Sequence, residues 1–256
     1  MKIYSVSLII ILSILLIPGC VGKGGGKKDT QTSNDTILVA DTGFTGIKHF
    51  MNGQILVMET TFKNGVKEGL MKTFYTNGKV RQSFWYKNGL REDSAKWYYE
   101  EGQVFRSTPF ERDTVNGTQI QYYQNGSVKA KLRYIKGIRT PFLEEFTLEG
   151  KLVTGYPEMV VSIRDDYRTK GIYTVSLELS DKSSEVNYYR GDFSNNVFDT
   201  TQCKKINTIN GIAHLNLRKT GPPNPGYVGV IAEILTKFGN KYLVYKEITL
   251  PYNDIN

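Results

Sequence analysis

A 24-residue period is the feature that most constrains the fold of this chain. Glycine recurs at this spacing, and aromatic residues recur at it in three further series. The series are Gly78/Gly102/Gly126/Gly150, Tyr75/Tyr99/Tyr123, Phe74/Tyr98/Tyr122/Phe146 and Phe62/Tyr86/Phe110/Tyr134. A period of about 20 to 50 residues is typical of repeat proteins, in which each unit is one supersecondary element that packs on its neighbours.

Each repeat is predicted to be a β-hairpin. Asn77-Gly78 lies between two runs rich in aromatic and β-branched residues, and Asn-Gly in that setting signals a two-residue type I′ turn. Such a loop would pair Tyr75 with Val80, Thr73 with Gln82, Met71 with Phe84 and Phe74 with Arg81. A second turn at Asn88-Gly89 leads into the next hairpin, so the sequence predicts a single-layer antiparallel meander over residues 43–153.

The middle of the repeat region departs from this pattern. Pro109 stands where the previous repeat has Trp85, and residues 112–116 carry no obvious signal for a tight turn. We expect the connection there to be looser than its counterparts.

The period also divides the predicted sheet into two faces, because alternate residues of a strand point to opposite sides. One face would carry Tyr75, Tyr99 and Tyr123 together with Val80. The other face mixes aromatic with basic side chains and is the candidate binding face, formed by Phe74, Arg81, Trp85, Tyr98, Tyr122 and Lys129. Such groups suit a glycan, an anionic lipid or a protein loop, although aromatic residues also join neighbouring strands and lysines keep a sheet soluble.

Residues 154–256 lack the period and are predicted to form a separate immunoglobulin-like β-sandwich. The cysteine and tryptophan core of antibody domains is missing, because Cys203 is the one cysteine there and no tryptophan follows Trp97. A sandwich packed on the last hairpin would cover the exposed edge of the repeat sheet. The expected strands are 159–164, 172–179, 185–190, 212–217, 227–236 and 242–250.

The N-terminus indicates the compartment. Residues 3–17 follow Lys2 as a mainly apolar stretch that would rise about 22 Å as a helix, which is typical of a signal segment and short for a membrane span. The Ile-Pro-Gly-Cys of residues 17–20 resembles a bacterial lipobox, which implies removal of residues 1–19 and lipidation of Cys20. The other interpretation is a plain signal peptide with a chance cysteine. Residues 20–42 are expected to be a flexible tether.

The sequence offers no constellation of catalytic or metal-binding residues. The two histidines, His49 and His214, are predicted to occupy a structural and a surface strand position, so neither a Ser-His-Asp triad nor a histidine metal site is readable. The acidic pairs Glu144-Glu145 and Asp165-Asp166 should each point to opposite faces of a strand, in turn or solvent roles. Cys203 is expected to be a buried thiol. We therefore expect no enzymatic activity, no cofactor and no metal.

The repeats resemble the bacterial variant of MORN repeats that occurs in YwqK-like antitoxins. The matching stretches are YTNGKV (75–80), YEEGQV (99–104) and YQNGSV (123–128), with a second turn in YKNG (86–89) and YIKG (134–137). The resemblance covers roughly 110 residues. It implies an elongated β-sheet used for protein or lipid contact and no enzymatic activity.

Together these features predict an all-β lipoprotein of the bacterial cell envelope, in the outer membrane if the cell has one. It would be held at the membrane by its N-terminal lipid and act as a scaffold for a protein or lipid partner of the envelope. No nucleic-acid partner is expected, because an exported chain rarely meets one. Two alternatives remain open, namely a YwqK-like antitoxin that neutralises a toxin by direct binding and a glycan-binding envelope module.

Overall fold

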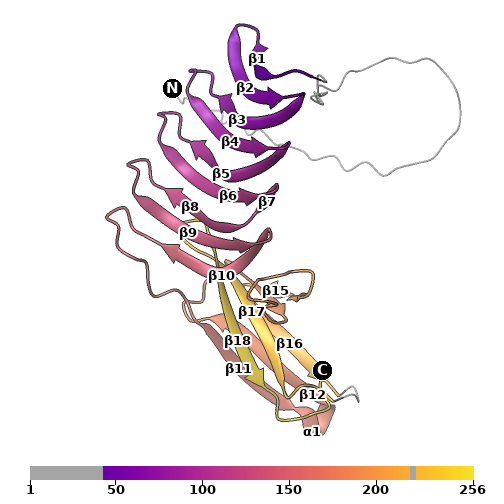
Figure 1. Ribbon diagram of the computed structural model, residues 1–256. Helices are drawn as coiled ribbons and strands as arrows, with labels where there is room; N and C mark the ends of the chain where they lie inside the picture. Colours follow the sequence, from indigo (N-terminus) through magenta and orange to yellow (C-terminus); the bar gives the residue numbers. More distant parts are fainter. Residues whose placement is uncertain (1–42, 220–222) are drawn as a thin grey trace, which may run out of the picture. The chain divides into compact units, whose positions relative to one another are not determined.

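The structure is a computed structural model that describes residues 43–219 and 223–256. The predicted signal segment, Cys20 and the tether 20–42 lie outside the described residues. Within the described residues the chain is all-β apart from one helical turn, which confirms the predicted fold class (Figure 1). None of the helices described is long and apolar enough to cross a membrane.

The repeat region folds into one antiparallel sheet in which consecutive strands are neighbours, as a meander requires. The strand order is β1-β2-β3-β4-β5-β6-β8-β9-β10, and the short strand β7 also pairs with β6. Figure 1 shows these strands following one another along the sheet. The strands are β1 (Gly46–Asn52), β2 (Ile55–Lys63), β3 (Val66–Phe74), β4 (Val80–Lys87), β5 (Leu90–Tyr98), β6 (Val104–Glu111), β7 (Thr114–Val115), β8 (Gly117–Tyr122), β9 (Val128–Ile135) and β10 (Ile138–Glu145).

The two turns of each repeat differ, and the type I′ turn lies at the second of them. Asn88 and Gly89 both have positive φ, 51° and 82°, and the flanking residues Lys87 and Leu90 pair directly. At the first turn only Gly78 has positive φ, and its N–H donates to the carbonyl of Tyr75 at 3.0 Å. This is a three-residue loop that closes on a glycine bulge, so the prediction of a two-residue loop at Asn77-Gly78 was wrong.

A second bulge, at Arg81, shifts the register at the start of β4. Thr73 pairs with Gln82 and Met71 with Phe84, as predicted, but the register then shifts and Val80 lies opposite Phe74 instead of Tyr75. The predicted pair of Phe74 with Arg81 is therefore absent. Val104 and Val128 lie opposite Tyr98 and Tyr122 in the same way, so each repeat contains the bulge.

The connection at Arg112-Asp113 is tight, which corrects the expectation of a looser loop. Both residues have positive φ, 48° and 67°, and the flanking residues Glu111 and Thr114 pair directly. Asp113 is held by Arg91, whose backbone N–H and Nε donate to Asp113 Oδ1 at 3.0 and 2.7 Å. The hydrogen bond from Arg91 also keeps the pKa of this carboxyl below its usual value. A side-chain interaction from the previous repeat thus stabilises a turn that lacks glycine.

Hydrogen bonds join each repeat to the next. The hydroxyls of Tyr75, Tyr99 and Tyr123 donate to the carbonyls of Tyr98, Tyr122 and Phe146 at 2.6, 3.0 and 2.8 Å. At the opposite end of the strands, the backbone N–H of the second turn donates to a carbonyl of the preceding repeat, as from Gly89 to Lys67 at 2.9 Å. The constant 24-residue spacing of these tyrosines thus corresponds to equivalent contacts between neighbouring repeats.

The C-terminal region forms two four-stranded antiparallel sheets, ordered β11-β12-β16-β15 and β14-β13-β17-β18. Their inner faces meet in a core that includes fully buried Val175, Leu177, Tyr188 and Val230. This strand order is that of an immunoglobulin fold with one additional strand, which confirms the predicted sandwich. The elements are β11 (Met159–Asp166), α1 (Tyr167–Lys170), β12 (Ile172–Leu179), β13 (Val186–Arg190), β14 (Lys204–Ile206), β15 (Thr208–Ile209), β16 (Ile212–Arg218), β17 (Tyr227–Leu235) and β18 (Lys241–Thr249).

The sandwich packs against the last strand of the repeat sheet, as expected for a cap on a sheet edge. The backbone N–H of Phe198 donates to the carbonyl of Arg139 on β10 at 2.8 Å, and Arg139 Nη2 donates to the carbonyl of Lys241 at 2.8 Å. Polar groups of β10 are therefore satisfied by the sandwich instead of remaining exposed.

Replacement of Tyr99 by Phe tests the hydrogen bonds between repeats. Loss of the hydroxyl that reaches Tyr122 should lower the free energy of unfolding by about 1 kcal/mol, measured in urea. Tyr86→Phe is the matched control, because the Tyr86 hydroxyl makes no hydrogen bond with any described residue. We expect the control to change stability by less than about 0.5 kcal/mol. Equal effects of the two changes would contradict this role of Tyr99.

Candidate functional site

The two faces of the repeat sheet differ in how deeply their side chains are buried. Cross-strand neighbours share a face of a sheet, and on one side the small and polar side chains are almost fully buried by their neighbours. We call this side the packed face, and it carries Thr60, Ala95, Thr108 and Ala130, exposed by 1%, 2%, 4% and 0%. The other side, the open face, carries the cross-strand row Lys72, Ser83, Lys96 and Ser107.

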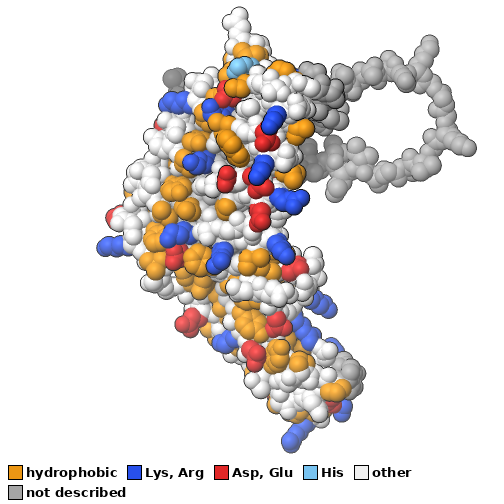
Figure 2. All heavy atoms as spheres, in the orientation of Figure 1, with side chains coloured by type: hydrophobic (Ala, Val, Ile, Leu, Met, Phe, Trp, Pro, Cys, Tyr) orange, Lys and Arg blue, Asp and Glu red, His pale blue; other side chains and the backbone are white. Residues whose placement is uncertain are grey.

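Four of the six residues of the predicted binding face lie on the open face. Trp85 lies opposite Leu70, and Phe74, Tyr98 and Tyr122 alternate along their strands with residues of the packed face. The remaining two, Arg81 and Lys129, lie within the bulges that follow the first turns, where they have no cross-strand partner in the register. Figure 2 shows hydrophobic, basic and acidic side chains interspersed over the side of the repeat sheet that faces the viewer.

Trp85 and Tyr98 come together in a groove on the open face. The groove has a volume of about 520 Å³ and is formed by side chains of β3, β4 and β5. The predicted residues Phe74, Arg81, Tyr122 and Lys129 do not line it. It is lined by Leu70, Lys72, Ser83, Phe84, Trp85, Asp93, Ser94, Lys96 and Tyr98.

The two tryptophans of the chain have opposite environments. Trp97, on the packed face, makes an edge-to-face contact with Phe84 at 5.6 Å and is covered by the Arg106 guanidinium at 4.1 Å. Trp85, on the open face, is 47% exposed, and no ring or cation of the described residues lies over its indole. Trp97 therefore has a packing role, whereas Trp85 presents a free aromatic surface.

Charged groups of the open face are only partly paired. Lys72 Nζ donates to Glu59 Oε1 at 2.8 Å, and Glu59 also faces His49 at 3.9 Å. Lys96 makes no ion pair with any described residue. In the groove, Lys96 is therefore available for a ligand, whereas Lys72 is paired with Glu59.

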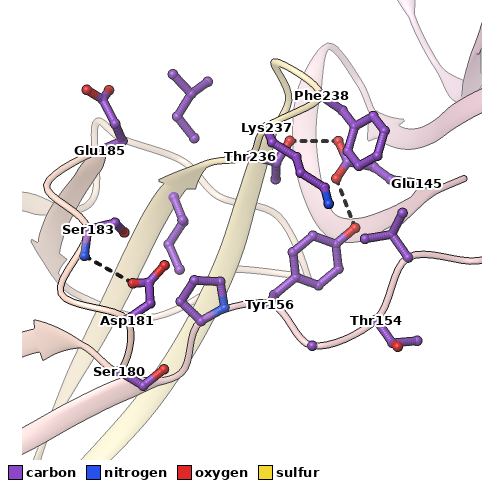
Figure 3. A pocket seen from close by; sticks show the side chains of 15 residues that line it. Glu145, Thr154, Tyr156, Ser180, Asp181, Ser183, Glu185, Thr236, Lys237 and Phe238 are labelled. Atoms are coloured by element: carbon purple, nitrogen blue, oxygen red, sulfur yellow. Dashed lines mark hydrogen bonds between the residues drawn. The ribbon is translucent and has the colours of Figure 1, made fainter. Parts of the chain in front are cut away.

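A second pocket, of about 560 Å³, lies where the repeat sheet meets the sandwich (Figure 3). Its wall contains Glu145 of β10, which is 0% exposed. The Glu145 carboxylate accepts hydrogen bonds from the Tyr156 hydroxyl at 2.9 Å, the Thr236 hydroxyl at 2.7 Å and Asn240 Nδ2 at 2.7 Å. Burial and the nearby Glu145 carboxylate raise the pKa of the Tyr156 phenol, so this group stays a hydrogen-bond donor at neutral pH.

Through these hydrogen bonds Glu145 connects the repeat sheet to the sandwich. Thr236 and Asn240 belong to the β17–β18 hairpin of the sandwich, whereas Tyr156 belongs to the segment that connects the two sheets. Asn240 is itself 6% exposed and accepts a further bond from Gln121 Nε2 at 2.8 Å. Because its donors enclose the carboxylate, Glu145 is a structural group of the joint.

Sequence reasoning predicted the orientation of the Glu144-Glu145 pair but missed the role of Glu145. The two residues do point to opposite faces, and Glu144 pairs with Lys131 on the open face at 3.0 Å. Glu145, however, has no turn or solvent role. The residues 24 and 48 positions before Glu145 are Gln121 and Trp97, and both lie on the packed face. This correspondence is the sequence signal that could have placed Glu145 on the packed face.

The other reactive side chains of the sequence analysis lie away from both pockets. Exposed His214 shares a hydrogen bond with Ser176, Nδ1 to Oγ at 2.8 Å, as expected for a surface strand residue. Cys203 is half-buried against Phe198 and its neighbours, and burial raises the pKa of its thiol. No group of three or more His, Cys, Asp or Glu side chains in the described ranges is arranged to hold a metal ion.

Comparison with known proteins supports the repeat assignment. Residues 67–88 and 115–136 each match the MORN repeat variant family. The first match covers most of β3 and β4 and the second covers β8 and β9, two periods of 24 residues apart. No curated protein and no solved structure matches the chain. The chain is thus a MORN-repeat β-sheet protein.

Replacement of Glu145 by Ala tests the joint. Three donors, of which Asn240 is buried and Tyr156 and Thr236 are half-buried, would lose their acceptor, so the free energy of unfolding in urea should fall by about 3 kcal/mol. The adjacent Glu144→Ala variant removes the same charge but only a partly exposed ion pair, which should cost less than about 1 kcal/mol. If both variants lost the same stability, Glu145 would have no special place at the joint.

Proposed function

We propose that the chain is a non-enzymatic, lipid-anchored protein of the bacterial cell envelope that binds a partner through the open face of its repeat sheet. The observation that carries this proposal is the difference between the two tryptophans. Trp97 is fixed by Phe84 and Arg106, whereas Trp85 is exposed at the wall of a groove that also contains Lys96. An exposed aromatic side chain next to a cation is typical of a recognition surface.

The joint at Glu145 supports a scaffold role for the sheet. A single-layer sheet with a free edge can pair with other chains, and the sandwich satisfies polar groups of the last strand. The repeat sheet is thereby held to a folded domain at its C-terminal end, which leaves its open face as the surface for a partner.

The anchor is proposed from the sequence. The lipobox-like residues 17–20 support lipidation of Cys20, and the residues from there to 42 would provide a tether between the membrane and β1. Two or three acyl chains hold a protein firmly at a membrane, because each buried CH₂ contributes about 0.8 kcal/mol.

The MORN-variant repeats also favour a second candidate function, that of a YwqK-like antitoxin which neutralises a toxin by direct binding. Such a protein would act on a cytosolic toxin only if the chain stayed inside the cell. The two functions therefore differ in compartment as well as in partner.

One experiment in cells tests both the anchor and the surface. Cells are fed an alkyne fatty acid and produce the protein with a photo-crosslinking amino acid at Ser94, on the open face. We expect fatty acid on the mature protein and a crosslinked species after irradiation.

The controls separate the two claims. A Cys20→Ser variant should lose the label, and the same crosslinker at Lys204, on the sandwich, should give no such species. Unlabelled, cytoplasmic protein would contradict the envelope function and favour the antitoxin. Equal crosslinking from both positions would contradict the open face as the contact surface.

A further inference from the structure

We propose that the groove at Trp85 binds an acidic sugar unit of an envelope polysaccharide. This inference rests on the proposed function, because it takes the open face as the contact surface, and it adds the chemical class of the ligand. The groove has a volume of about 520 Å³, within the range of about 300 to 1,000 Å³ that is usual for ligand sites.

Trp85 supplies a flat apolar platform. Its indole is 47% exposed and carries no ring or cation contact with the described residues. The face of an aromatic ring is electron-rich, so it attracts the polarised C–H groups on the apolar face of a pyranose ring. Leu70, 36% exposed and directly opposite Trp85, extends the apolar surface.

Hydroxyl groups surround this platform. Ser94 is exposed at the groove, and Ser83 Oγ lies 3.1 Å from the Tyr98 hydroxyl, so these groups form one polar strip beside the indole. A hydroxyl both donates and accepts hydrogen bonds, as do the hydroxyls of a sugar. An apolar ligand would leave the remaining hydrogen-bonding capacity of these hydroxyls unmet, at a cost in binding free energy.

One cation of the groove is available to an acidic ligand. Lys72 is already paired with Glu59, and acidic residues at the groove are Asp93 in the lining and Glu92 opposite Trp85. Lys96 has no ion-pair partner among the described residues, so its ammonium is available to a carboxylate.

The groups present fit a carboxylate sugar better than a phosphate headgroup. Phosphate sites typically use arginine forks or free backbone N–H groups at a helix N-terminus. The groove contains no arginine, and its backbone belongs to paired strands. A lysine beside an aromatic platform can instead hold the carboxylate of a uronic acid whose ring lies on the indole.

The groove occurs at one place in the repeat region, although the backbone pattern recurs. One period after Trp85 the chain has Pro109, and one period after Lys96 it has Ile120. The combination of platform and cation is thus confined to β3–β5, as a specific binding site requires. Repeat packing alone does not demand Trp85, because Pro109 occupies the same position in the next unit.

The test uses the purified protein and three acidic tetrasaccharides, namely tetragalacturonate, tetraguluronate and the hyaluronan tetrasaccharide. Galactotetraose is the neutral counterpart, and binding is measured by calorimetry at low and high salt. We expect at least one acidic tetrasaccharide to bind more tightly than galactotetraose, with an affinity that falls as salt rises.

Two variants assign this binding to the groove. Trp85→Ala should weaken it about tenfold, as expected for an aromatic anchor, and Trp85→Phe should restore part of the loss. Lys96→Gln should weaken acidic ligands about threefold and leave galactotetraose unchanged, since it removes one partly solvated ion pair. Lys204→Gln, on the sandwich, removes the same charge and should change nothing. Circular dichroism of each variant confirms that it is folded.

No binding of any acidic tetrasaccharide, or binding that survives both groove variants, would overturn the inference. If sugar binding is absent while crosslinking from Ser94 persists in cells, the open face still contacts a partner and only the ligand class is wrong. If both are absent, the proposed function fails as well.

Discussion

The hydrogen bonds from one repeat to the next are the interaction on which the rest of the structure depends. Tyrosine hydroxyls at Tyr75, Tyr99 and Tyr123 each reach a carbonyl 23 residues further along the chain. The second turns bond back to the preceding repeat on the other edge. Together with the backbone pairing of neighbouring strands, these bonds join the hairpins into one continuous sheet with a constant register of side chains.

That register gives the sheet two unlike faces. Residues of the packed face bury one another, and at the last strand the packed-face position is taken by Glu145, which the sandwich encloses with three donors. The open face keeps its tryptophan and a lysine accessible. The packed face is thus used for contacts within the protein and with the sandwich, whereas the open face is left for recognition.

The sequence allowed the architecture to be predicted because its signals are local. The period, the glycines and the alternation of apolar residues indicate the meander, and six sandwich strands lie within two residues of their predicted bounds. Features set by distant partners were missed. The tight turn at Asp113 depends on Arg91 in the previous repeat, and Glu145 depends on donors 91 and 95 residues away. In the groove, Trp85 and Tyr98 were predicted, whereas Ser94 and Lys96 join them only through the pairing of β4 with β5.

The exposure of the two tryptophans in solution tests the account most directly. The chain contains two tryptophans, and they report separately on the two faces. In hydroxyl-radical footprinting with mass spectrometry, exposed Trp85 should be oxidised faster than half-buried Trp97 in the native protein, and the difference should disappear when the protein is unfolded. Comparable oxidation of both residues, or protection of Trp85 in the free protein, would contradict the division of the repeat sheet into an open and a packed face.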